Sequence, residues 1–532
     1  MKKIVLILAS LAFMVSSNKN ALGQNPLQKK IESGIIEGAI SPHDNQVERY
    51  LGIPYAKPPV GNLRWKPPQK PLPWQGALKT QKFSKKAMQP LVKWNTMDKL
   101  SEDCLHLNVW KPKNITDGKL PVLVIIHGGG LGMGGTRGPE LEGTSMAKKG
   151  IIVVTINYRL NIFGFLAHPE LSAETSYKGS GNYGFMDQQF ALQWVKNNII
   201  SFGGDPNRIT IAGESAGARS VHTLTTSPLS KDLIAGAVGS SGGVNPVFSL
   251  KTAEEIGVLI LKKLGYNSIA ELRKASTEDI IKIYNSAEAA KLINPYQPTL
   301  DNYVILAEIT ETYKANKQAN IPLLIGWNSA ERPGERFLKG PNYSKKYFIK
   351  RTKDKLPEHY KEVLKMYPHE SENDVKWSAT ALISSSIFLK GWKWFDLHRK
   401  NTNQAVYRYL FSKIPPPHNT VDLSTYTLPI GPSHAQEIAY AWGNLSLRKD
   451  YNYTDVDYKV SAIMQEYLAN FIKTGNPNGG QLPEWPSVKP DSDSPMIMNF
   501  NTETKVIPAS NDYRLKYFDN EGAIYKSYVI DK

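Results

Sequence analysis

Apolar, β-rich runs, several of them continuously apolar, alternate with helical segments, and this pattern most limits what the sequence can fold into. Six such runs occur, at Pro121–Ile126, Ile151–Asn157, Arg208–Ala212, Ile234–Gly239, Ile321–Gly326 and Ala405–Phe411. Strands that are apolar on both sides belong in a sheet whose two faces are covered. Amphipathic helices are expected between them, at Asp187–Ile199, Ala253–Leu264, Glu437–Leu447 and Val456–Lys473. This alternation predicts an α/β fold built on a mainly parallel sheet.

The first residues have the pattern of a secretory signal. Lys2 and Lys3 precede a 12-residue apolar run, Ile4–Val15, and small residues follow it up to Gly23. Such a run is too short to span a bilayer, so we expect residues 1–23 to be removed on export. Residues 24–532 are then expected to form one large domain, with a small antiparallel sheet near its start. A short signal and the absence of disulfides favour a secreted or periplasmic bacterial protein.

Composition excludes several classes of protein. The 532 residues hold a single Cys, so a disulfide scaffold is impossible. The net charge of +17 falls to about +14 without Lys2, Lys3 and Lys19, and it is spread along the chain. Without a basic tail or C-x-x-C fingers, the sequence does not indicate a nucleic-acid partner. No later apolar run is long enough for a membrane anchor.

The segment Gly213-Glu214-Ser215-Ala216-Gly217 fits G-x-S-x-G, and its context makes Ser215 the candidate nucleophile. A nucleophile elbow needs a strand, a sharp turn with small residues and a helix, and all three are predicted around Ser215. A second match, centred on Ser241, runs into glycines and a proline instead of a helix. Ser241 is therefore interpreted as a structural serine near the site.

A glycine-rich loop directly after the run Pro121–Ile126 is the candidate oxyanion hole. It reads His127-Gly128-Gly129-Gly130, and glycines let backbone N–H groups approach a ligand closely. An HGGG loop after an early strand is typical of the α/β-hydrolase arrangement. The expected donors are the N–H groups of Gly129, Gly130 and Ala216.

The acid and the base of a triad should follow the serine in that order. Glu331 is the first carboxylate after the run Ile321–Gly326, and Glu335 competes with it. Spacing alone leaves His418 and His434 as near equals for the base. Three other histidines lie in helical sequence and are interpreted as surface residues: His359, His369 and His398.

From about Gly34 to Asp519 the sequence resembles the type-B carboxylesterase family. The resemblance is carried by Gly52-Ile53-Pro54-Tyr55-Ala56, by Ser101-Glu102-Asp103-Cys104-Leu105, by Asn157-Tyr158-Arg159-Leu160 and by the whole run from Gly181 to Gly217. It implies an α/β-hydrolase fold. Asn328-Ser329-Ala330-Glu331 is similar to the family's acid segment, and Gly431-Pro432-Ser433-His434 to its histidine segment. The resemblance therefore favours Glu331 over Glu335 and His434 over His418.

The sequence also departs from the family pattern. Met88 stands where the family commonly has a Cys that pairs with the one in its second signature, so Cys104 is expected to be a free, buried thiol. Arg332 replaces the Gly that usually follows the acid. Arg219, on the predicted helix after Ser215, and Leu131, after the HGGG loop, are expected to alter the rim or the acyl side of the pocket.

The sequence thus predicts a secreted serine esterase with a Ser215-Glu331-His434 triad and an acyl-enzyme intermediate. No metal or organic cofactor is implied. Because neutral His434 would be the base, activity is expected to fall below about pH 6.5. The substrate would be a small-molecule or glycan-linked carboxylic ester, and a feruloyl- or acetyl-type esterase acting on polysaccharides is the alternative within enzymes. An alternative of another class is a non-catalytic adhesion protein with an esterase fold.

Overall fold

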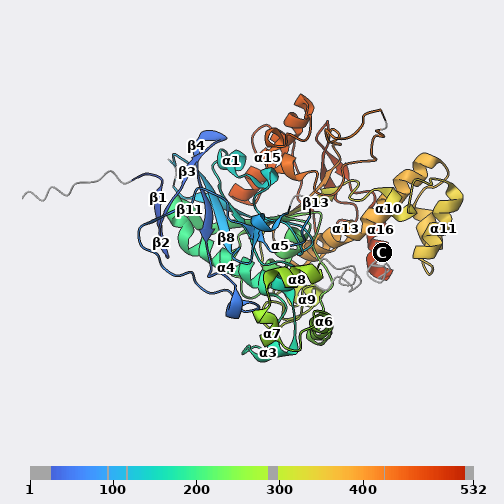
Figure 1. Ribbon diagram of the computed structural model, residues 1–532. Coiled ribbons are helices and arrows are strands. Elements are labelled where there is room, and N and C mark those ends of the chain that lie inside the picture. Colours follow the sequence, from blue (N-terminus) through green and yellow to red (C-terminus); the bar gives the residue numbers. More distant parts are fainter. Residues whose placement is uncertain (1–24, 93–94, 116–117, 285–296, 425, 522–532) are drawn as a thin grey trace, which may run out of the picture.

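The computed structural model describes residues 25–92, 95–115, 118–284, 297–424 and 426–521. The expected signal at residues 1–23 lies outside these ranges. Within them, no helix combines the length and the apolarity that a bilayer span requires. The described chain is organised around one large twisted sheet with helices on both faces (Figure 1).

The large sheet has eleven strands in the order β16-β15-β14-β13-β12-β11-β9-β10-β8-β4-β3. All six predicted strands are confirmed and lie side by side in its middle, where every neighbouring pair is parallel. Their bounds are β9 (Leu120–Ile126), β10 (Ile152–Ile156), β11 (Gly204–Glu214), β12 (Gly236–Ser240), β13 (Leu323–Asn328) and β14 (Val406–Phe411).

Strands that the sequence patterns did not reveal extend the sheet at both edges. They are β3 (Ala39–Ser41), β4 (Asp44–Pro54), β8 (His106–Pro112), β15 (Met496–Phe500) and β16 (Lys505–Pro508). β15 pairs with β14 in parallel, and the others pair antiparallel.

A small N-terminal sheet joins β1 (Gln28–Ile31), β2 (Gly34–Glu37) and β5 (Ala77–Lys79). It is mixed rather than wholly antiparallel, because β5 runs parallel to β2. The β-hairpin of β3 and β4, also in the N-terminal 75 residues, joins the large sheet instead. A two-stranded pair, β6 (Lys86–Ala87) with β7 (Leu100–Ser101), follows.

Both faces of the sheet are buried, and β9 shows why its sequence is continuously apolar. Val122 and Val124 belong to one hydrophobic core, while Leu123 and Ile125 belong to the other. The first core includes α4 (Tyr183–Asn198) and α5 (Ala216–Thr226), and the second includes α15 (Asp455–Thr474). A strand covered on both sides needs apolar residues at every position.

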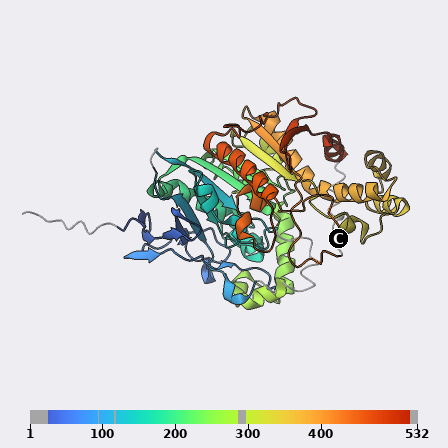
Figure 2. The same ribbon diagram turned by 90° about the horizontal axis from the view of Figure 1, so that it is seen from above.

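The remaining helices cover the sheet and extend the molecule at one end. Figures 1 and 2 show α10, α11 and α13 grouped at the end opposite β1 and β2. The bounds are α1 (Thr144–Ala147), α2 (Asn161–Phe165), α3 (Pro169–Ala173), α6 (Leu250–Lys263), α7 (Ile269–Lys274), α8 (Thr277–Tyr284), α9 (Ile309–Lys314), α10 (Gly334–Leu338), α11 (Lys345–Lys355), α12 (Tyr360–Met366), α13 (Glu372–Asn401), α14 (Ile438–Ala441) and α16 (Asp512–Glu521).

Three of the four predicted helices are confirmed as α4, α6 and α15, but the helix expected over Glu437–Leu447 is wrong. The segment forms only the four-residue α14 and a short 3-10 helix at Leu445–Leu447. Gly443 separates them with φ +69°, a left-handed conformation that ends a helix.

Candidate active site

Ser215 occupies a strained turn between β11 and α5. Its φ of +56° with ψ −118° is a backbone conformation that residues with a side chain rarely adopt. Its N–H donates to the carbonyl of Ser240 on the neighbouring strand β12, at 2.8 Å. The sheet therefore holds the turn, and the serine begins the helix as its N-cap residue.

The glycines on either side of Ser215 are required by the crossing of backbone segments. A Cβ on Gly213 would lie 2.3 Å from the carbonyl carbon of Gly217. A Cβ on Gly217 would lie 2.1 Å from the carbonyl oxygen of Ile126, at the end of β9. This explains the G-x-S-x-G pattern: β11, α5 and the end of β9 meet more closely than any side chain allows.

The HGGG loop leaves β9 beside this turn. Gly129 and Gly130 have φ of +109° and +67°, and the Gly129 carbonyl accepts from the N–H of Met133 at 3.0 Å. In the described part of the chain, the N–H groups of Gly129, Gly130 and Ala216 have no recorded acceptor. Three backbone donors without a partner are what an oxyanion hole requires.

His127, at the start of this loop, is a buried structural residue. It stacks on Tyr158 with a centroid separation of 4.5 Å, and the Tyr158 hydroxyl donates to its carbonyl at 2.9 Å. Burial lowers the pKa of His127 to about 4, so the ring is neutral and adds no charge to the loop.

Glu331 and His434, 103 residues apart, form a hydrogen-bonded pair. The Glu331 Oε2 atom lies 2.5 Å from His434 Nδ1. The other carboxylate oxygen, Oε1, accepts from the Ser241 hydroxyl at 2.6 Å and from the N–H of Asn328 at 2.8 Å. Glu331 is fully buried in the loop after β13, and these donors fix its orientation.

His434 faces a second carboxylate. Its Nε2 atom lies 3.1 Å from Oε1 of Glu214, the residue before Ser215. In the described chain no hydrogen bond joins His434 to the Ser215 hydroxyl. Sequence reasoning missed Glu214, because the G-x-S-x-G pattern leaves the middle positions free. Its proximity to His434 follows only from the fold.

Three carboxyl groups act on the His434 ring: Glu331 and Glu437, which are buried, and Glu214, whose side chain is partly exposed. Burial and the neighbouring negative charges raise the pKa of Glu214 to about 8 and that of Glu437 to about 7, although the charge of His434 opposes both shifts. Burial alone would lower the pKa of His434. The hydrogen bond that His434 donates to Glu331 and the charges of the three carboxylates outweigh it and raise that pKa to about 9.

The rejected alternatives lie elsewhere. Glu335 is exposed on α10 and accepts from the Tyr343 hydroxyl. The Nε2 atom of His418 lies 3.6 Å from Oδ2 of Asp450, and the ring packs edge-on against Tyr451. Ser241 is the predicted structural serine, since it orients Glu331.

One interpretation of the histidines was wrong. His398 is buried on α13, with its Nε2 atom 2.8 Å from the Ile321 carbonyl, and is not a surface residue.

Some of the positions that depart from the family pattern lie beside the site. Arg219 lies one turn along α5, where its N–H donates to the Ser215 carbonyl and its guanidinium donates to Asn245 at 2.9 Å. Leu131 is fully buried with φ +62°. Cys104 is a free, buried thiol as predicted, and burial raises its pKa well above the usual range.

A cavity of about 330 Å³ adjoins the glycine loop on the Glu214 side. Gly128, Gly129 and Glu214 form its inner end. Polar and charged side chains contribute much of the remaining wall, among them Lys86, Gln89, Asn95, Glu140 and Arg448. The space beside Glu214 and the glycine loop can therefore accept a polar group.

Comparison with known proteins identifies the family. Residues 25–518 match the carboxylesterase family model. The chain is 34% identical over 481 residues to the fumonisin B1 esterase of Sphingopyxis macrogoltabida, covering 86% of this chain and 84% of the relative. It is 30% identical over 507 residues to the para-nitrobenzyl esterase of Bacillus subtilis, covering 90% and 96%.

Solved structures also resemble this chain over most of its length. A carboxylesterase of Geobacillus stearothermophilus superimposes with a TM-score of 0.77 at 29% identity, covering 92% of this chain and 99% of that one. A para-nitrobenzyl esterase structure gives a TM-score of 0.76 at 28% identity. These structures and the sheet described above confirm the predicted α/β-hydrolase fold. The chain therefore belongs to the carboxylesterase family and is a carboxylic ester hydrolase.

Proposed function

We propose that ester hydrolysis proceeds through Ser215 as nucleophile, His434 as general base and Glu331 as the acid that orients His434. The observation that carries this proposal is the 2.5 Å hydrogen bond between Glu331 Oε2 and His434 Nδ1, together with the strained turn at Ser215. The bond to Nδ1 directs the lone pair of Nε2 away from Glu331, as a base requires.

His434 has to exchange one partner for another during the reaction. Its Nε2 atom contacts Glu214, and activation of Ser215 requires the same nitrogen to accept the serine proton. Catalytic hydrogen bonds are often completed only when substrate binds. Attack on the ester carbonyl then gives a tetrahedral oxyanion, which the N–H groups of Gly129, Gly130 and Ala216 stabilise. Each donor contributes about 3 kcal/mol by comparison with other oxyanion holes. Expulsion of the alcohol leaves an acyl-enzyme, which water hydrolyses.

The test combines turnover with covalent labelling. The purified protein should hydrolyse para-nitrophenyl acetate and butyrate, and Ser215→Ala should abolish this activity. A phosphonate ester should label one serine, identified by peptide mass spectrometry as Ser215. Ser241→Ala is the matched variant for the second G-x-S-x-G segment, and it should still be labelled at Ser215. Labelling at Ser241, or equal turnover by wild type and Ser215→Ala, would contradict the assignment.

A second candidate within the same reaction is an esterase of sugar-linked esters. The polar and charged lining of the cavity beside Glu214 favours it, because the alcohol part of a glycan ester carries many hydroxyl groups. Turnover of acetylated xylan or methyl ferulate, set against para-nitrophenyl butyrate and palmitate, distinguishes it from a general carboxylesterase. A protein inert toward every ester, with Ser215 unlabelled, would instead support the adhesion alternative.

We also propose that residues 1–23 direct export and that residues 24–532 fold as one unit. The charged start and the apolar run Ile4–Val15 support the first part. Mass spectrometry of the exported protein should find Gln24 at its N-terminus. Calorimetry should find one unfolding transition, and two well-separated transitions would contradict the single unit.

A further inference from the structure

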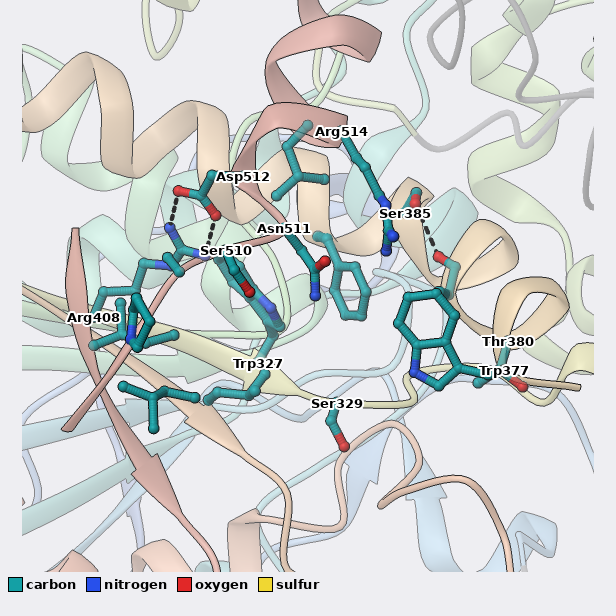
Figure 3. Close-up of a pocket in the computed structure, with 18 of the residues that line it drawn as sticks. Trp327, Ser329, Trp377, Thr380, Ser385, Arg408, Ser510, Asn511, Asp512 and Arg514 are labelled. Carbon is teal, nitrogen blue, oxygen red and sulfur yellow. Dashed lines mark hydrogen bonds and ion pairs between the residues drawn. The ribbon is translucent and has the colours of Figure 1, made fainter. Parts of the chain in front are cut away.

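A second cavity, of about 240 Å³, lies apart from the proposed catalytic residues (Figure 3). Its walls come from three parts of the chain: β13 and β14, helix α13, and the segment from Ile507 to Leu515 that leads into α16. None of the triad or oxyanion residues lines it. A water molecule takes about 30 Å³ of liquid, so the space exceeds what one or two ordered waters would fill.

Two arginines line this cavity, and one of them has a counter-ion. The Arg408 guanidinium forms two hydrogen bonds with the Asp512 carboxylate, at 2.6 and 2.7 Å, and lies 4.4 Å above the Trp327 ring. Both charged side chains are buried. This pair is neutral overall, and it shows how the fold compensates a buried guanidinium here.

Arg514 has no such compensation. Only 9% of the residue is exposed, and its guanidinium lies between the rings of Tyr367 at 4.6 Å and Trp377 at 4.8 Å. Its Nε donates to the Tyr513 hydroxyl at 3.2 Å. Among the described residues no carboxylate lies within 4.0 Å of it, and its two terminal nitrogens have no recorded hydrogen bond. Aromatic faces hold this guanidinium without a carboxylate, so the cavity carries a positive charge that lacks a counter-ion.

The residues around Arg514 indicate what kind of ligand could neutralise the charge of its guanidinium. Figure 3 shows the side chain of Arg514 reaching toward the space between Asn511 and Trp377. Much of the remaining wall is apolar: Trp327, Phe388, Leu410, Ile497 and Leu515. The site thus offers one cation with free donors, and beside it a surface suited to a hydrocarbon body.

We propose that this cavity binds an amphiphilic monocarboxylate, an aromatic or short alkyl acid. Its carboxylate would accept two hydrogen bonds from the terminal nitrogens of Arg514, the geometry that guanidinium groups favour. Its body would pack against the apolar wall. A dianion such as phosphate fits less well, because only one positive charge is uncompensated and Asp512 shares the cavity.

The test measures binding of phenylacetate to the full-length protein by isothermal titration calorimetry, with tryptophan fluorescence as a second readout. Phenylacetamide is the neutral probe of the same shape. We expect phenylacetate to bind about ten- to a hundredfold more tightly than the amide, the range of one charge-assisted hydrogen-bond pair. Equal binding of acid and amide, or no binding of phenylacetate, would overturn the proposal.

Variants assign the binding to this cavity rather than to the catalytic site. Arg514→Gln should lose phenylacetate affinity by at least about tenfold. Arg351→Gln is the matched control, since Arg351 is equally buried and lies 5.9 Å above the Phe337 ring, but does not line the cavity. It should bind as wild type does.

A further variant covers the case in which Arg514→Gln fails to fold. Asn511 is exposed at the cavity wall just before α16, so Asn511→Asp adds a negative charge without a change of shape. Asp is also favourable at that end of a helix. It should weaken phenylacetate binding by repulsion. Unchanged affinity in both Asn511→Asp and folded Arg514→Gln would show that the acid binds elsewhere.

Discussion

At the scale of single residues, the environment of His434 is the most informative part of the site. Each ring nitrogen contacts a different carboxylate, Glu331 at Nδ1 and Glu214 at Nε2. Sequence reasoning and family resemblance identified Glu331 and His434. They could not identify the role of Glu214, because its proximity to His434 depends on how the loop after β14 returns to the turn after β11.

The pH profile should differ from that of an isolated histidine. A base must be neutral, so activity is lost as pH falls through the His434 pKa, which its carboxylate neighbours raise to about 9. We expect the acid limb of kcat/KM to have a midpoint closer to 9 than to 6.5, which moves the sequence-based expectation upward. Rates with para-nitrophenyl butyrate, corrected for spontaneous hydrolysis, would show this. A midpoint at or below 6.5 would contradict it.

Replacing Glu214 should shift the acid limb of the kcat/KM profile. Glu214→Gln removes one negative charge 3.1 Å from Nε2, which lowers the His434 pKa. The acid limb should therefore shift to lower pH. Glu140→Gln is the control, since Glu140 lines the neighbouring cavity but is not among the charges acting on His434. An unchanged limb in Glu214→Gln would show that Glu214 does not set the charge of the base.

Ser241 should act as a positioning residue. Its hydroxyl donates to Glu331 Oε1 at 2.6 Å, and a hydrogen bond to a charged group contributes about 1.5–3 kcal/mol. Ser241→Ala should lower kcat/KM by about tenfold or more and leave KM nearly unchanged, far less than the loss in Ser215→Ala. Unchanged kcat/KM in Ser241→Ala would contradict a positioning role, and a phosphonate label on Ser241 of the wild type would instead make Ser241 the nucleophile.

At the scale of elements, the glycine loop after β9 allows a graded test of the oxyanion hole. A Cβ on Gly129 would lie 2.2 Å from the Met133 carbonyl oxygen, whereas one on Gly130 would meet nothing within 4 Å. Gly129→Ala should therefore distort the loop and lower kcat by about 10²–10³. Gly130→Ala should lower it less, with about 1 kcal/mol of backbone strain.

Gly150→Ala is the control for strain alone. Gly150 has φ +77° and open space around it, and it does not line the cavity beside the glycine loop. Its variant should lose about as much stability as Gly130→Ala and keep full kcat. If Gly129→Ala were as active as Gly150→Ala, the donors of the oxyanion hole would have to be sought elsewhere.

Elements were predictable where a single physical cause decides them. Most of the six central strands contain runs of apolar residues because both of their faces are covered, so their sequences reveal them. Edge strands such as β16 are partly exposed and carry no such pattern. The 30-residue helix α13 was missed as a unit, because it is buried on several sides and lacks a clear polar face.

At the scale of the whole molecule, one buried ion pair ties the loop after β10 to α4. The Arg159 guanidinium makes hydrogen bonds to both oxygens of Asp187, at 2.7 and 2.8 Å, and both side chains are almost fully buried. Asp187→Asn leaves the cation uncompensated and should lower the free energy of unfolding by about 3–5 kcal/mol. Denaturant titration would measure the loss.

An exposed ion pair provides the comparison with the buried Arg159–Asp187 pair. Glu362 lies 2.7 Å from Lys365, with 54% and 71% of these side chains exposed. Glu362→Gln should change stability by less than about 1 kcal/mol, because water screens the pair. Equal losses in Asp187→Asn and Glu362→Gln would show that burial does not set the strength of the Arg159–Asp187 interaction.

The single cysteine gives a probe of global unfolding. Cys104 is the only Cys of the chain, and it is 1% exposed in a core where burial raises its thiol pKa. A thiol reagent such as dithionitrobenzoate should therefore react with the native protein only at the rate of unfolding, and with one equivalent in denaturant. Rapid reaction of the native protein would contradict this burial.

The strand order has a consequence for how the protein is made. After β9 and β10 pair, each later strand from β11 to β15 adds to the same growing edge in the order of synthesis. From β11 onward the nascent chain can therefore extend its sheet strand by strand, whereas β10 lies between the two earlier strands β8 and β9. The proposed serine, acid and histidine are synthesised in this order, at residues 215, 331 and 434 of 532. A ribosome-bound chain thus stays catalytically silent through most of its translation, and the timing of synthesis itself delays the onset of hydrolysis.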